Sequence, residues 1–205
     1  MRAYFLRPNA DNLAEEKLIE LFKDYKELYI AVAYFNNKKF SNLLINRADN
    51  HFPTNLLINT SDILRPQNDG DSEIAISEAL MKVIVASSKG LINVRSLGTR
   101  AKGKYQNMHH KFYMNSDKLF FGSVNLTDAA LNRNYELLTE TYDKHIIENF
   151  KNEFNSMWKI ASEIYTGRDN KLRSLMCPIC ERHEGVDFES YGPICTFCGH
   201  KFSLK

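Results

Sequence analysis

The sequence predicts an α/β fold, in which a parallel or mixed β-sheet is flanked by helices. Short apolar runs rich in β-branched and aromatic residues, typical of buried strands, alternate with longer segments whose apolar residues recur at helical spacing. A chain of 205 residues suits one main domain with room for a small module. An apolar content of 43% and a charged content of 25% indicate a soluble, globular protein.

The first part of the chain alternates helices with strands. Residues 12–25 carry an apolar stripe at helical spacing, and Asp11 or Asn12 can cap this helix. Residues 27–35 form a near-continuous apolar run, as expected of a strand buried on both faces. The elements expected next are a short helix over 37–47, a strand over 55–61, a loop over 65–73, a helix over 74–87 and a strand over 91–97.

The second part continues the alternation. Glycines and cations over 98–106 predict a loop. The elements expected next are a strand over 105–115, a turn over 115–117, a strand over 118–125, a short helix capped by Thr127, a strand over 135–143 and a long helix over 144–165. The apolar stripe of this last helix fits core packing or a dimer face. We therefore expect a main domain over 1–165, a polar linker over 166–174 and a small module over 175–205.

The residues with the most informative chemistry lie between His109 and Glu136. Because side chains alternate faces along a strand, His109 and Lys111 are expected to share a face, as are Ser123 and Asn125. Lys and Asn suit the non-bridging oxygens of a phosphate, and His suits proton transfer or nucleophilic attack near neutral pH. Either pair alone is common in exposed strands and turns. The two pairs in order, followed by Asn134 and Glu136, indicate a phosphoryl site.

This ordered pattern of HxK, GSxN and a later Glu resembles the signature of the phospholipase D superfamily. The resemblance implies a phospholipase D-like sheet flanked by helices, and phosphodiester hydrolysis without a catalytic metal. It implies that His109 is the nucleophile, which forms a phosphohistidine, or else the acid. Lys111 and Asn125 would stabilise charge on the phosphoryl oxygens. Ser123 would support the site, and Glu136 would orient a histidine.

The motif occurs once in this chain, and this bears on the assembly. Superfamily members with one copy pair two protomers across a two-fold axis. We therefore expect a homodimer with one composite site, in which the two copies of His109 face each other.

The pattern departs from the superfamily at one position and leaves one choice open. The superfamily has an Asp five residues after the Lys, but Ser116 stands there and Asp117 follows it. Either the turn shifts by one residue or the chain resembles members that lack this Asp, which include a metal-independent restriction enzyme. His110 competes with His109 as the reactive histidine. His109 is favoured because only it has the two-residue spacing to Lys111.

The charge distribution favours a nucleic-acid substrate. The net charge of +2 decides nothing, but the stretch from Ala79 to Ser116 has no acidic residue. It contains cations expected to bind the backbone of a polyanion: Arg100, Lys102 and Lys104. A solvated face whose acids lie elsewhere is the alternative explanation. The leading hypothesis is a metal-independent nuclease that cleaves DNA or RNA, and the resemblance to small bacterial nucleases suggests restriction, phage defence or repair.

Two other functions stay open. The first is a nucleic-acid-binding module with a degenerate site, which the missing Asp supports and the retained motif residues oppose. The second is transfer to an alcohol in place of hydrolysis.

No apolar run approaches the roughly 20 residues that span a bilayer, and the start resembles no signal peptide, so we expect a cytoplasmic protein without a membrane partner.

The C-terminal module carries all the cysteines, as two CxxC pairs: Cys177, Cys180, Cys195 and Cys198. In a chain without an export signal, two such pairs predict metal ligation rather than disulfides. Four thiolates complete a tetrahedron around zinc, and metal binding would supply the folding energy that so short a segment lacks. The pattern resembles a zinc ribbon, with zinc in a structural role.

Overall fold

The computed structural model describes residues 1–8, 12–66, 72–74, 76–87, 92–101, 104–164, 186–187, 194–195 and 202–204. In chain order the elements are β1 (Arg2–Leu6), α1 (Leu13–Phe22), β2 (Leu28–Val32), α2 (Lys38–Asp49), β3 (Thr54–Asn59), the short 3-10 helix η1 (Thr60–Asp62), β4 (Leu64–Pro66), β5 (Ser72–Ile74), α3 (Glu78–Ser87), β6 (Ile92–Ala101), β7 (Lys104–Asn107), β8 (Lys111–Met114), β9 (Leu119–Gly122), α4 (Asp128–Asn132), β10 (Glu136–Thr141), α5 (Lys144–Ile160), β11 (Ser162–Ile164), β12 (Val186–Asp187), β13 (Ile194–Cys195) and β14 (Phe202–Leu204).

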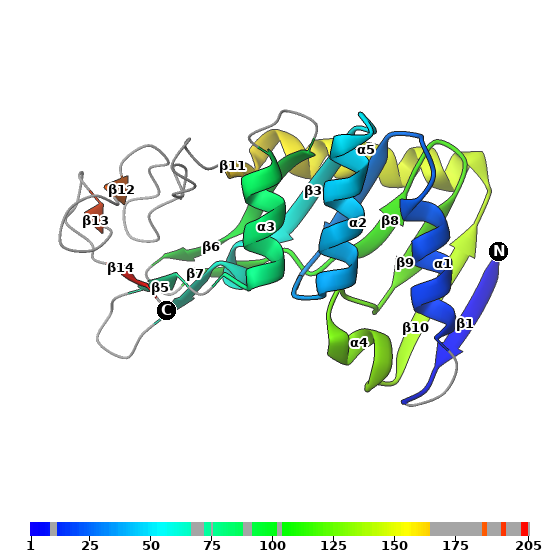
Figure 1. Cartoon of the computed structure of the whole chain (residues 1–205), viewed down its shortest axis with the longest axis horizontal. Helices are drawn as coiled ribbons and strands as arrows, with labels where there is room; N and C mark the ends of the chain where they lie inside the picture. Colours follow the sequence, from blue (N-terminus) through cyan, green and yellow to red (C-terminus); the bar gives the residue numbers. More distant parts are fainter. Residues whose placement is uncertain are drawn as a thin grey trace.

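One mixed sheet dominates the described part of the chain. Its strand order is β1, β10, β9, β8, β2, β3, β6 and β11, and β7 pairs with β6 beyond this path. Strands β2, β3 and β6 are parallel, whereas β8, β9, β10 and β1 follow on one side in antiparallel pairs. Helices α1, α2 and α3 cover one face, and α5 crosses the other (Figure 1). The α/β prediction with a mixed sheet is confirmed. Strands β4, β5 and β14 form a small separate sheet, as do β12 and β13.

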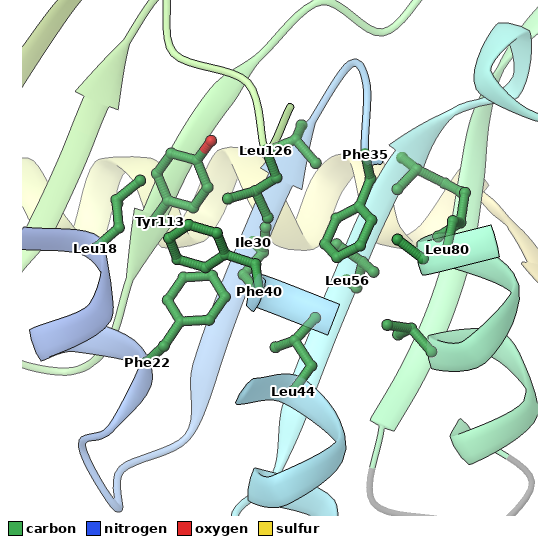
Figure 2. Packing of buried hydrophobic residues seen from close by; sticks show 14 of the residues in the cluster. Leu18, Phe22, Ile30, Phe35, Phe40, Leu44, Leu56, Leu80, Tyr113 and Leu126 are labelled. Atoms are coloured by element: carbon green, nitrogen blue, oxygen red, sulfur yellow. The ribbon is translucent and has the colours of Figure 1, made fainter. Parts of the chain in front are cut away.

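Strand β2 at the centre of the sheet is apolar because both faces of the sheet are covered there. In β2, Ile30 and Val32 face the core under α1, α2 and α3, while Ala31 faces the core under α5. Figure 2 shows the first core around Phe22 and Phe40, whose ring centroids lie 4.9 Å apart in an edge-to-face arrangement. This burial on two faces explains why β2 shows no polar alternation.

The ends of several elements follow their capping chemistry. The Asn37 side chain accepts a hydrogen bond from the Phe40 amide at 3.0 Å and caps α2. Thr127 caps α4 through its hydroxyl, as predicted, with 3.2 Å to the Ala130 amide. Asn12 stands at the N-cap of α1, but its side chain makes no capping hydrogen bond.

Several predictions about secondary structure were wrong in part. Residues 98–106 contain a β-hairpin rather than a loop, because β6 continues to Ala101 and pairs with β7 from Gly98 opposite Asn107 to Ala101 opposite Lys104. The expected loop over 65–73 overlaps the short strands β4 and β5. The strand expected over 105–115 is broken between β7 and β8. The sequence prediction also missed the three-residue β11 and the edge strand β1, which among the described strands pairs with β10 alone.

Candidate active site

The motif residues gather at one edge of the sheet. Val32 at the carboxyl end of β2 pairs with Lys111 at the start of β8. At the same edge β9 ends at Gly122 and β10 begins at Glu136, because both strands pair antiparallel with their neighbours. In open α/β sheets, ligands bind at the carboxyl ends of the parallel strands, and this edge is that end of β2.

His109 and Lys111 are brought together by a hydrogen bond rather than by a shared strand face. The strand argument was wrong here, since β8 begins only at Lys111 and His109 lies in the irregular segment before it. The Lys111 ammonium donates to the His109 carbonyl oxygen at 2.7 Å. This contact draws the ammonium back along the chain and leaves the His109 side chain exposed at the edge of the sheet.

Both groups have pKa values displaced from their ordinary ones. Burial lowers the pKa of Lys111, whose side chain is 8% exposed, and the charge of Glu136 acts in the opposite direction. The pKa of His109 is lowered first by partial burial and then by the charges of Lys111 and His110. His109 therefore stays neutral, as a nucleophile must, to a lower pH than an ordinary histidine.

Gly122 allows β9 and β10 to meet closely at the site. Its φ is +155°, and a Cβ atom there would lie 2.0 Å from the Leu137 carbonyl oxygen. No side chain fits in that space. Immediately after it, the Ser123 amide donates to the Leu137 carbonyl oxygen at 2.9 Å, and the Leu137 amide donates to Ser123 Oγ at 2.9 Å. The glycine of the GSxN motif thus fixes where the serine lies.

Ser123 and Asn134 hold the carboxylate of Glu136 from two sides. The Ser123 hydroxyl donates to Glu136 Oε2, and the Asn134 amide group donates to Oε1 at 3.2 Å. Ser123 follows the end of β9 and Asn134 precedes the start of β10. The serine hydroxyl both receives and donates a hydrogen bond, so it links the backbone of β10 to the carboxylate.

Asn125 lies in the loop between β9 and α4, also outside the strand that was expected to carry it. Its Oδ1 accepts from the Tyr34 amide at 3.2 Å, just beyond β2. Among the described residues, none accepts from its Nδ2 group, which is a donor suited to a phosphoryl oxygen. A bridge between Phe35 and Leu126 fixes this loop beside β2.

His110 and Asp117 face elsewhere. His110 Nε2 lies 3.7 Å from Glu153 Oε1 on α5, and its ring meets the Phe112 ring edge-on with centroids 6.1 Å apart. Asp117 lies in the turn between β8 and β9, at the opposite edge of the sheet from Lys111. There it pairs with Lys26 and, at 2.7 Å, with Lys144, which holds the pKa of Asp117 well below its usual range. Asp117 therefore secures a turn remote from the motif.

The remaining predicted site residues are described only in part. Arg100 and Lys104 lie on β6 and β7, in the hairpin that leads into the segment with His109, whereas Lys102 is outside the described residues. Cys195 ends β13 and is buried. The other three cysteines lie outside the described residues: Cys177, Cys180 and Cys198. Within the described ranges, no three His, Cys, Asp or Glu side chains form a metal-binding group, and no helix is both long and apolar enough to cross a membrane.

The sequence pattern included Asn134 before Glu136 but assigned it no role, and in the structure its side-chain amide donates to the Glu136 carboxylate. Its spacing of two residues before the glutamate was the available signal. The contact of Tyr34 with Asn125 uses a backbone amide and has no sequence signal.

Comparisons with known proteins agree with this architecture. The sequence matches the family described as "Cardiolipin synthase, PLD-like domain" over residues 18–158. No curated protein matches it significantly. Among solved structures, NucT from Helicobacter pylori is 17% identical, with a TM-score of 0.59 over 78% of this chain and 96% of that one. Nuc from Salmonella typhimurium, a phospholipase D family member, is 13% identical, with a TM-score of 0.60 over 80% of this chain and 97% of that one. Phosphatidylserine synthase from Haemophilus influenzae is 16% identical, with a TM-score of 0.57 over 78% of this chain and 39% of that one. At these identities the structural similarity concerns the fold.

Proposed function

Because the chain belongs to the phospholipase D-like family, we propose that it is a nuclease, which hydrolyses a phosphodiester of DNA or RNA without a catalytic metal. The observation that carries the proposal is the meeting of the motif residues at one edge of the sheet. His109 and Lys111 are joined by one hydrogen bond, and Ser123 and Glu136 by another, at adjoining strand ends.

The chemistry follows from the residue types. A neutral His109 imidazole attacks phosphorus, so that a P–N bond forms and the P–O bond to the leaving group breaks. The partner subunit's His109, protonated, gives its proton to the departing oxygen. Water then attacks phosphorus, the P–N bond breaks, and the partner's His109 takes the proton of the water. The products are a phosphomonoester and a free hydroxyl group.

Three other groups would stabilise the charge and position the reactants. The Lys111 ammonium and the Asn125 Nδ2 group suit the equatorial oxygens of the transition state, where charge accumulates. Glu136, held by Ser123 and Asn134, would orient an imidazole through hydrogen bonding. Together with two histidines these groups supply a nucleophile, an acid and positive charge, which is the full set that the reaction needs.

The proposal requires a homodimer. One chain contributes one HxK and one GSxN, whereas attack and protonation need two histidines on opposite sides of phosphorus. His109 is exposed at the edge of the sheet, where a second copy can approach it about a two-fold axis.

The cations of the sequence bear on the substrate. The hairpin with Arg100 and Lys104 precedes His109 directly, so its cations suit the backbone of a nucleic acid. We further propose that the tail over 175–205, with its two CxxC pairs, is a structural zinc ribbon, and that the protein acts in the cytoplasm in restriction, phage defence or repair.

The test is cleavage of plasmid, single-stranded DNA and RNA in excess EDTA by the wild type, His109→Ala and His110→Ala. We expect wild-type cleavage to persist, His109→Ala to abolish it and His110→Ala to retain most of it, because His110 points toward α5. Loss of cleavage in EDTA, or cleavage by His109→Ala, would contradict the mechanism. Binding of nucleic acid without cleavage under any condition would favour the alternative, a binding module with a degenerate site.

A further inference from the structure

A groove of about 590 Å³ adjoins the site along the edge of the sheet. Strands β1 and β10 form its floor, with Phe5 directly opposite Leu137 and Tyr135 two residues before Leu137. Side chains opposite each other in an antiparallel pair project from the same face, whereas Tyr135 lies just before β10 and lines the same groove. The groove is lined by Phe5, Leu6, Arg7, Ser123, Tyr135, Glu136 and Leu137, and we call it the β1–β10 groove.

The aromatic side chains of the β1–β10 groove face solvent. Phe5 and Tyr135 are each 80% exposed, more than the other aromatic residues that the structure describes, and Leu137 is 38% exposed. Other side chains of β1 are used for packing, since Leu6 belongs to the core and the Tyr4 hydroxyl donates to Glu140 at 2.5 Å. Apolar rings gathered in one exposed groove indicate a binding surface.

The β1–β10 groove and the proposed phosphoryl site share two residues. Ser123 and Glu136 line the groove and also form the hydrogen bond at the centre of the site. The groove therefore lies beside the place where Lys111 and Asn125 would hold a phosphate, on the side of β10 and β1. Arg7 at its rim provides a positive charge for the next phosphate, and its planar group can stack on a base.

We propose that the β1–β10 groove holds one unpaired nucleobase beside the scissile phosphate, stacked on Phe5 and Tyr135. This inference rests on the proposed nuclease function and specifies its substrate: a single strand, or a duplex from which one base is displaced. Aromatic side chains stack on bases of every type, so the groove selects for strandedness rather than sequence. A paired base is already stacked on both sides, and its removal from a duplex is unfavourable.

Binding measurements test the groove independently of catalysis. In a His109→Ala background, a fluorescein-labelled oligothymidylate is titrated with the full chain, with Phe5→Ser/Tyr135→Ser and with Tyr25→Ser as the matched control. Tyr25 is 70% exposed and precedes β2, so it lies at the opposite edge of the sheet. We expect the double variant to bind about tenfold or more weakly and Tyr25→Ser to bind like the parent. Tyr135→Phe, which keeps the ring, should also bind like the parent.

The same oligonucleotide with abasic residues supplies the second arm. We expect it to bind the parent as weakly as the intact oligonucleotide binds the double variant, and to show no further loss with that variant. Equal binding of the intact strand by parent and double variant would overturn the proposal, as would failure of the parent to bind. A fall from dimer to monomer mass in the double variant would also overturn it, because the groove would then be a contact between copies. Cleavage by the chain with His109 in EDTA shows separately whether the proposed function stands.

Discussion

Gly122→Ala is the most demanding test of how the backbone builds the site. The added Cβ would lie 2.0 Å from the Leu137 carbonyl oxygen and 2.9 Å from its carbon, at a φ of +155°. Backbone strain of this kind costs about 1–3 kcal/mol. Strands β9 and β10 would have to separate by about 1 Å to relieve the overlap, which breaks the two 2.9 Å hydrogen bonds between Ser123 and Leu137 at about 1 kcal/mol each. The free energy of unfolding should therefore fall by roughly 3–5 kcal/mol.

The same displacement should impair catalysis, because Ser123 and Glu136 would separate. A misplacement of about 1 Å typically lowers the rate about 10²-fold. Urea denaturation gives the stability change, and cleavage at a temperature where the variant is folded gives the rate. Ser123→Ala is the control, since it removes the hydroxyl and keeps the backbone, and it should lower stability by only about 1 kcal/mol. A Gly122→Ala protein with wild-type stability and rate would refute this account of the strand junction.

Three further predictions follow from the described contacts. Lys111→Met keeps the buried apolar stem of the side chain and removes the ammonium. The kcat of cleavage should fall about 10²–10³-fold while the circular dichroism spectrum is unchanged. A fall of less than about tenfold would contradict a role of Lys111 in stabilising charge on the phosphoryl oxygens. The His109 imidazole should titrate by NMR below pH 6.5. In Lys111→Met the midpoint of this titration should rise toward 6.5, because one of the charges that lower the pKa of His109 is gone while its partial burial remains. An unchanged midpoint would exclude the Lys111 charge as a cause. Arg47 is 3% exposed and donates to the carbonyl oxygens of Phe22 at 3.1 Å and Lys26 at 2.6 Å. Arg47→Met should therefore lower the free energy of unfolding, measured by urea denaturation, by about 3 kcal/mol. The exposed control Lys38→Met should change it little.

The fold was predictable from the sequence where apolar pattern and burial agree. Strand β2 and helices α2 and α5 lie close to their predicted positions, because a strand covered on both faces is apolar throughout and a helix covered on one side has an apolar stripe. Strand β1 was missed because it pairs with β10 at the edge of the described sheet and its exposed Phe5 breaks the expected apolar pattern. The hairpin over β6 and β7 was missed because glycines and cations are typical of loops, although antiparallel pairing also accommodates them.

The identity of the site residues came from the motif, but their placement did not. His109, Ser123 and Asn125 lie beyond strand ends, where alternation of side chains gives no guide, and hydrogen bonds to neighbouring strands position them instead. For the Asp of the superfamily pattern, the sequence left two possibilities open: a turn shifted by one residue, with Asp117 in its place, or no such Asp. Long-range pairs with Lys26 and Lys144 place Asp117 at the far edge of the sheet, and such pairs depend on the fold.

The proposed mechanism requires two chains to share one site, and a subunit-mixing experiment measures whether they do. Wild type and His109→Ala are co-refolded at increasing mole fractions of the variant, the dimer mass is checked by sedimentation, and cleavage in EDTA is measured at constant total protein. A composite site that needs both histidines predicts activity proportional to the square of the wild-type fraction, hence roughly one quarter at an equal mixture. A linear decline, with roughly one half of the activity at an equal mixture, would show that each chain carries a complete site and would contradict the account.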